Sequence, residues 1–256
     1  MYISLFGPIR VDVGATVLHR RDFGGRKPKQ LLQLLALHPR GVSKERLAEL
    51  MWDGRAPANV TATVEHYACV LRRKLSAPGV PGSKVIVSEP GGYRLDRQIA
   101  RLDIDRFDAL AALTPDNASC EAALAIAVGD LLEDEPYAAW AVSARVRYRV
   151  RCVRLLLDAA QSALLAGDAT RAVMLAERAV AADLLNERAY QMLVVGHYVL
   201  DDQRAALAAY HRCRMTLAAE VGVDPLPMTK ALFDGVLQHV PVLELMSRAQ
   251  RSAALS

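Results

Sequence analysis

The stretch Asn59–Leu75, NVTATVEHYACVLRRKL, decides the fold, because it has the pattern of one amphipathic helix. Its apolar residues recur at helical spacing along a single stripe: Val64, Ala68, Leu71 and Leu75. The opposite arc carries small, hydrogen-bonding and cationic residues, namely Ala62, His66, Cys69 and Arg73, flanked by Thr63, Tyr67 and Val70. Such an outward face suits the major groove of DNA, and an ordinary surface helix is the alternative.

The order of elements around this helix is more specific than the helix itself. We expect strands in residues 2–19, a helix starting near Pro28, a helix after Ser43, the helix Asn59–Leu75, and a hairpin over residues 85–95. Ser43 and Asn59 are predicted N-caps, and the turn of the hairpin is expected over Glu89-Pro90-Gly91-Gly92. Strands, two helices, a longer helix and a hairpin make up a winged helix-turn-helix with an added N-terminal sheet.

The second half of the chain reads as helix after helix. Breaks are expected at 115–117, 167–168, 184–186 and 201–202. The acidic run Asp130–Pro136 is interpreted as a solvated helix end rather than as a metal site. The tail from Leu245 to Ser256 is expected to be exposed, as a frayed helix or a disordered end.

An internal repeat connects these helices. Gly167-Asp168 and Asp201-Asp202 lie 34 residues apart, and at the same offset Ala172 matches Ala206. Ala176 matches Tyr210 and Ala179 matches Cys213 in the same way. A period of 34 residues with small residues where helices touch is typical of tetratricopeptide repeats, and a helical bundle without repeats is the alternative.

Charge divides the chain into two halves. Residues 1–100 hold 16 Lys/Arg against 8 Asp/Glu, a net charge of +8, and residues 101–256 hold 16 against 20, a net charge of −4. A basic half joined to an acidic half suggests that only the first part meets a polyanion.

Several classes of protein find no support in the sequence. The four cysteines show no CxxC pairing, which argues against a zinc site and suits a reducing cytoplasm. We find no signal peptide, no apolar run of membrane-spanning length, no GxGxxG, no P-loop and no HExxH. We therefore expect a cytoplasmic, nucleoid-associated protein that is no enzyme, with neither a metal nor a cofactor and without a membrane partner.

Two motif sets give the chain a family resemblance over roughly residues 2–240. PKQLLQLLALHPRGVSKERLAELMW, LRRKL and GGYRLD resemble the OmpR-type winged-helix output domain. LDIDRF, DEPYAAW and DDQRAALAAYHRCRMTLAAEVGVDPLP resemble the bacterial transcriptional activator domain. In this order the pair resembles the Streptomyces antibiotic regulatory protein (SARP) family. The resemblance implies a sequence-specific activator that binds direct repeats near promoters and recruits RNA polymerase.

The resemblance also implies which residues meet DNA. It implicates helix positions Thr63, His66, Tyr67, Val70 and Arg72, with Trp52 at the backbone and Arg94 in the hairpin. The helical pattern adds Arg73, which is better placed for phosphate than for bases. For His66, Arg72 and Arg94 the alternatives are an exposed histidine, a salt bridge within the domain and a solvated strand residue.

The sequence departs from the family pattern at Ala62 and Val70, where many relatives carry arginine. Losing two cations weakens the phosphate contribution to affinity, while Val70 can meet a thymine methyl group. Either the target is richer in A·T or the intrinsic affinity is low.

The predicted architecture is mainly α. It comprises a winged-helix DNA-binding domain (1–97), a linker (98–102), an all-α tetratricopeptide-like activator domain (103–240) and a tail (241–256). The predicted function is transcriptional regulation through double-stranded DNA, with RNA polymerase as a partner and a homodimer on DNA left open. The alternative is a protein–protein adaptor that uses the helical repeats and whose winged helix has lost DNA binding.

Overall fold

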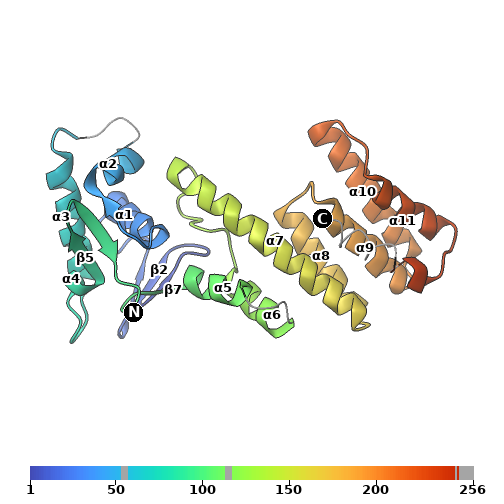
Figure 1. The fold of residues 1–256 in the computed structure, drawn as a ribbon, viewed down its shortest axis with the longest axis horizontal. Coiled ribbons are helices and arrows are strands. Elements are labelled where there is room, and N and C mark those ends of the chain that lie inside the picture. Colours follow the sequence, from blue (N-terminus) through green and yellow to red (C-terminus); the bar gives the residue numbers. More distant parts are fainter. Residues whose placement is uncertain (53–56, 113–116, 246, 248–256) are drawn as a thin grey trace. The chain divides into compact units, whose positions relative to one another are not determined.

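The computed structural model describes residues 1–52, 57–112, 117–245 and 247 of the chain (Figure 1). These residues form two compact units. The first comprises Met1–Ala112 and Ala125–Tyr148, and the second comprises Leu113–Leu124 and Arg149–Ser256. This division differs from the expected linker at 98–102, since part of the region assigned to the helical domain belongs to the first unit.

The first unit begins with a four-stranded sheet in the order β3-β2-β1-β7. Its strands are β1 (Tyr2–Ser4), β2 (Arg10–Val13), β3 (Thr16–His19) and β7 (Arg101–Leu102). The first three pair as an antiparallel meander, with Ile3 opposite Val11 and Val11 opposite Leu18. These three side chains are buried, so the predicted alternation is confirmed.

Three main helices, one short helix and a second sheet complete the winged helix. The helices are α1 (Arg26–Leu37), α2 (Lys44–Trp52), α3 (Val60–Lys74) and the short α4 (Gly82–Val85). Strands β4 (Val42–Ser43), β5 (Ile86–Glu89) and β6 (Gly92–Leu95) form a sheet in the order β4-β6-β5. The predicted hairpin is thus confirmed, whereas α1 begins at Arg26, two residues before Pro28, because Gly25 occupies the N-cap position.

The segment expected as a linker is part of the first sheet. Arg101 and Leu102 pair in parallel with Tyr2 and Ile3, and α5 (Asp103–Ala111) follows directly. The buried carboxylate of Asp103 accepts hydrogen bonds from the backbone N–H groups of Leu5 (2.6 Å) and Phe6 (2.9 Å). These bonds fix α5 to β1, which is why the structural boundary lies beyond 102.

The acidic run Asp130–Pro136 is not a helix end, and only part of it is solvated, since Asp130 and Glu133 are exposed. The Asp134 and Glu135 side chains are 2% and 1% exposed and both pair with Lys29 on α1. Burial would raise the pKa of Glu135, but hydrogen bonds from Lys29 and Gln30 and the Lys29 charge hold that pKa below its usual value. Asp134 and Glu135 are therefore structural parts of the first unit, because their charges find buried partners about 105 residues away in sequence.

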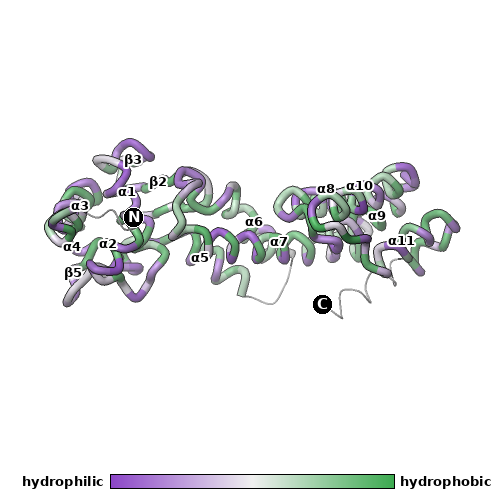
Figure 2. Tube along the Cα trace, turned by 90° about the horizontal axis from the view of Figure 1, so that it is seen from above, coloured by the Kyte–Doolittle hydropathy of each residue, from purple (hydrophilic) through white to green (hydrophobic). Residues whose placement is uncertain are grey.

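The remaining helices follow the predicted breaks. They are α6 (Asn117–Ile126), α7 (Val142–Leu165), α8 (Ala169–Ala182), α9 (Glu187–Val199), α10 (Gln203–Val221) and α11 (Pro227–Leu237), and a 3-10 turn at Ala139–Ala141 precedes α7. Figure 2 shows alternating hydrophilic and hydrophobic bands along α7, the pattern of a helix with one buried face. The break expected at 115–117 reaches into residues outside the described ones.

The 34-residue repeat is visible in caps and in packing. The Asp168 and Asp202 side chains cap α8 and α10 alike, accepting from the N–H groups of Arg171 (3.0 Å) and Ala205 (2.9 Å). The small residues at matched positions, Ala172 with Ala206 and Ala179 with Cys213, are all fully buried. The prediction of a tetratricopeptide-like module is confirmed.

A polar network, buried at its Gln191–Thr229 bond, fixes α11 against α9. The Glu187 carboxylate accepts from the Leu226 N–H (2.8 Å) and from the Thr229 hydroxyl (2.6 Å), and Thr229 accepts from Gln191 (2.9 Å). The motif around Pro225–Pro227 thus has a structural role. At the end of the described chain Leu245 is fully buried, which corrects the exposed tail expected from there on; residues 246 and 248–256 lie outside the described ones.

Candidate nucleic-acid interface

Helix α3 presents one buried and one open face. Val64, Ala68 and Leu71 are at most 1% exposed, as their spacing predicted. Asn59 caps the helix through a 3.0 Å bond from the Ala62 N–H to its side-chain oxygen. The predicted outward arc is exposed at each position: Ala62, His66, Cys69 and Arg73. The local sequence therefore fixes both the start of the helix and the face that it offers.

Arg72 joins α3 to the wing, the β5–β6 hairpin. Its Nε and Nη2 donate to the Ile86 carbonyl oxygen at 2.9 and 2.7 Å, and Nη2 also donates to the Ser88 hydroxyl at 2.8 Å. The guanidinium lies 5.6 Å from the ring centre of Tyr93. Arg72 thus acts inside the domain, but through uncharged acceptors rather than through the salt bridge that the sequence offered as the alternative. Any DNA contact by Arg72 remains a prediction.

Arg94 of the wing is ion-paired. Its Nε lies 2.6 Å from the Glu89 carboxylate, and both side chains are about one-third exposed, at 32% and 35%. A pair at this exposure contributes little stability and can exchange its partner for a phosphate at small cost. The contact of Arg94 with DNA remains a prediction, and the structure adds Glu89 as its competitor.

One flank of α3 faces α1 and the end of α2. The Tyr67 ring stacks on Trp52 at 6.2 Å and 20°, and the Lys27 ammonium lies 5.3 Å above the Trp52 ring. That ammonium also donates to the Met51 carbonyl oxygen. Burial, and then the Arg26 charge, lower the pKa of Lys27. Trp52 and Tyr67 form one aromatic edge beside the outward face, a contact that sequence spacing did not predict.

Thr63 and Val70 lie on this same flank. The Thr63 hydroxyl donates to the Asn59 carbonyl oxygen (2.8 Å), so it is engaged within the helix. Val70 is half-buried against the turn between β3 and α1. The contact with Gly24 of that turn is close, because a Cβ atom added to Gly24 would lie only 2.7 Å from Val70 Cγ1. Part of the Val70 side chain stays open, and its predicted meeting with a thymine methyl group is untested.

The free cations of α3 lie at its C-terminal end. Lys44 is paired with Glu65 at 2.6 Å, and this hydrogen bond raises the pKa of Lys44. Arg73 and Lys74 are exposed, and among the described residues no carboxylate pairs with either. These two cations are available for phosphate.

Other kinds of site find no support in the described residues. Within them, no group of three or more His, Cys, Asp or Glu side chains is arranged to hold a metal ion. No helix in the described part of the chain has both the length and the apolar character that a membrane crossing requires.

The open face of α3, the braced wing and the capped repeat helices define the class: a winged-helix transcriptional regulator of the OmpR type joined to a tetratricopeptide-like module. Residues 24–95 match the family model for the transcriptional regulatory protein C-terminal domain, and residues 95–237 match that for the bacterial transcriptional activator domain. The chain belongs to the bacterial transcriptional activator domain family and is a transcriptional regulator of the SARP type.

Individual relatives support this assignment. The regulatory protein MoaR1 of Mycobacterium tuberculosis is 32% identical over 265 residues, which cover 97% of this chain and 83% of MoaR1. The regulatory protein AfsR of Streptomyces coelicolor is also 32% identical, but the match covers 98% of this chain and 26% of AfsR. Mycobacterium tuberculosis EmbR, solved with a low-affinity phosphopeptide, shares the fold with a TM-score of 0.77 at 23% identity, over 99% of this chain and 70% of that one.

Proposed function

We propose that the protein binds duplex DNA with α3 in the major groove and the β5–β6 wing beside it, and that it activates transcription from direct repeats near promoters. The exposed face of His66, Cys69 and Arg73, opposite the buried stripe, carries this proposal. The +8 net charge of residues 1–100 supports it further.

The predicted contacts divide into two groups. Arg73 and Lys74 suit phosphates, because they are exposed cations at the end of the helix. His66 lies at the centre of the outward face and suits base edges, with Thr63, Tyr67 and Val70 along the flank toward Trp52. Arg94 suits the minor groove once Glu89 releases it.

The helical module is proposed to contact RNA polymerase, and a homodimer on DNA would match direct repeats. This part of the proposal rests on the family and on the acidic balance of residues 101–256, which disfavours DNA as the partner of the module. The proposed location is the cytoplasm, at the nucleoid.

Fluorescence anisotropy with a labelled duplex tests the interface, using fragments first selected from genomic DNA. We expect His66→Ala and Arg94→Ala each to weaken binding about tenfold, and Arg73→Ala to reduce the slope of log K against log salt by about one. Cys213→Ala is the control, because Cys213 is buried in α10.

The adaptor alternative makes the opposite forecast. A winged helix that has lost DNA binding should show weak binding to random duplex and almost no salt slope. Unchanged affinities in both His66→Ala and Arg94→Ala, with a functional wild type, would mean that the interface lies elsewhere.

A further inference from the structure

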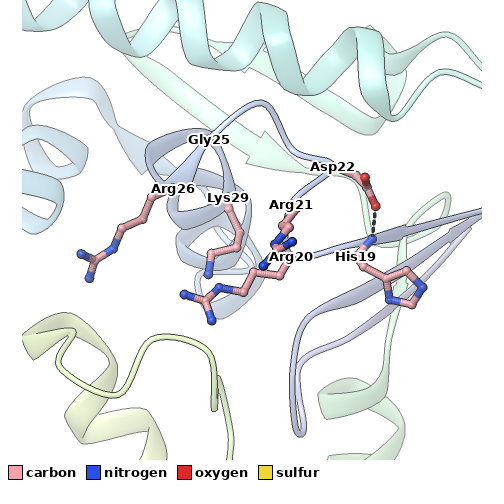
Figure 3. A pocket seen from close by; sticks show the side chains of 7 residues that line it. All are labelled: His19, Arg20, Arg21, Asp22, Gly25, Arg26 and Lys29. Atoms are coloured by element: carbon pink, nitrogen blue, oxygen red, sulfur yellow. Dashed lines mark hydrogen bonds between the residues drawn. The ribbon is translucent and has the colours of Figure 1, made fainter.

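A hollow of about 850 Å³ opens between β3 and the first turn of α1, within the first unit. Figure 3 shows the seven residues that line it: His19, Arg20, Arg21, Asp22, Gly25, Arg26 and Lys29. Four of these carry a positive charge and one carries a negative charge. Neither Arg20 nor Arg21 was predicted from the sequence as a functional residue.

Two of the four cations already have acidic partners. Lys29 is 2% exposed and pairs with Asp134 and, at 2.9 Å, with Glu135. Arg26 lies 3.1 Å from Glu135, but its side chain is 66% exposed, which leaves part of its guanidinium open to solvent. The Asp22 carboxylate accepts a 2.7 Å hydrogen bond from the His19 N–H, so it is engaged within its own turn (Figure 3).

Arg20 and Arg21 have no such partner. Both are exposed, and within the described part of the chain no carboxylate forms an ion pair with either. Adjacent arginines beside Arg26 and Lys29 repel one another, and an anion in the hollow would relieve that repulsion. The planar N–H fork of arginine matches the oxygens of a phosphate group in particular.

We propose that this hollow is a phosphate-binding site in which Arg20, Arg21 and Arg26 are the donors. The lining residues include no phenylalanine, tyrosine or tryptophan on which a base could stack, so the site fits phosphate groups rather than a nucleoside. Its arginines would bind phosphate in addition to the contacts proposed for α3 and the wing.

The phosphate has two sources. One is the DNA backbone, because Gly24 of the same turn lies against Val70 of α3; this source rests on the proposed function. The other is a free polyphosphate, because the exposed side chains of Arg20, Arg21 and Arg26 leave the hollow open to an anion from solution. A free ligand would act independently of DNA binding.

The test uses the full-length Arg20→Ala/Arg21→Ala double variant with two probes. Inorganic tripolyphosphate is titrated by calorimetry, and a random-sequence duplex is titrated by anisotropy over a series of salt concentrations. The matched control is Arg204→Ala/Arg214→Ala, which removes two exposed arginines of α10 and the same charge. Circular dichroism and the thermal midpoint check that each variant is folded.

If DNA is the source, the double variant should lose about two units of salt slope and about tenfold in duplex affinity, and the control should lose neither. If a free polyphosphate is the source, the wild type should bind tripolyphosphate, the double variant should bind at least tenfold more weakly, and duplex binding should stay unchanged. Arg20→Lys/Arg21→Lys should restore part of the binding in either case, since it restores charge without the fork.

Equal behaviour of the double variant and the α10 control with both probes would overturn the site, whether both lose binding or neither does. A wild type that binds no duplex would instead overturn the proposed function. In that case the tripolyphosphate titration alone would show whether the hollow binds phosphate.

Discussion

The winged-helix unit and the repeat helices α8–α11 are held together by different kinds of contact. In the first unit, buried charges meet across long stretches of sequence: Lys29 with Asp134 and Glu135, and Asp103 with the N–H groups of Leu5 and Phe6. In the repeats, neighbouring helices meet through buried alanines, and each cap lies three residues from its donor. Removing one partner of a buried charge pair is costly, because the other partner stays buried and unpaired. Packed alanines instead tolerate little added side-chain volume.

The largest effect is expected from Lys29→Met. Removing the ammonium leaves the buried Asp134 without its cation and leaves Glu135 with Arg26 alone, which should cost about 3–5 kcal/mol. Hydrogen exchange on the full chain should show α1 losing protection while α9 and α10 keep theirs.

Lys230→Met is the matched change in the second unit. The pair of Lys230 with Asp224, at 3.3 Å, has side chains 44% and 77% exposed, so it should cost at most about 1 kcal/mol. Equal losses in the two variants would refute the contrast between the units.

The next effect is a pH dependence that should be confined to the first unit. Burial raises the pKa of Asp103 to about 6 from 3.8. Because the folded state then binds the proton more tightly than the unfolded state, this group stabilises the fold below pH 4 and the contribution is lost as pH rises through 6. The change should amount to about 3 kcal/mol.

Denaturant titrations at a series of pH values can measure this contribution. The unfolding free energies of the wild type and Asp103→Asn should diverge between pH 4 and 6 and run parallel above that range. Curves that stay parallel throughout would show that Asp103 does not titrate there.

Overpacking should affect the repeats specifically. Ala206 is fully buried, and Ala206→Leu should cost about 1–3 kcal/mol, because the helices must separate to admit the added carbons. Ala208 is exposed on the same helix, so Ala208→Leu should change stability by less than about 0.5 kcal/mol. Similar losses at both positions in denaturant unfolding would argue against close contact at Ala206.

The smallest effect is expected at a cap. Asp202→Ala removes the acceptor of the Ala205 N–H and should cost about 1 kcal/mol, seen as faster exchange in the first turn of α10. Asp202→Asn should restore most of that protection, since asparagine caps equally well. A loss in Asp202→Asn as large as in Asp202→Ala would mean that the charge, rather than the hydrogen bond, is what matters.

The contrast between the units also explains which predictions succeeded. The buried stripe of α3, the Asn59 and Ser43 caps, the hairpin and the 34-residue repeat were all predicted from spacing, and the structure confirms them. Each depends on residues three to four apart, or on one repeat unit, so the signal is contained in a short stretch of chain.

The wrong expectations share the opposite property. Asp134 and Glu135 were expected to be solvated, and residues 101–102 were expected to lie in a linker, because their partners, Lys29 and β1, lie far away in sequence. For the same reason the sequence could not decide whether Arg72 contacts DNA or its own domain. Ile86 and Ser88 come near Arg72 only when the wing folds back.

By itself, then, the sequence determined the helix Asn59–Leu75, the face that it turns outward, its capping residue and the family to which the chain belongs. Only the tertiary structure decided which cations of the described residues lack a carboxylate partner, and Arg73 and Lys74 on α3 and Arg20 and Arg21 beside α1 are among them. The physical reason is that periodicity is a property of neighbouring residues, whereas the pairing of a charge depends on which carboxylate or carbonyl the fold brings within about 4 Å of it.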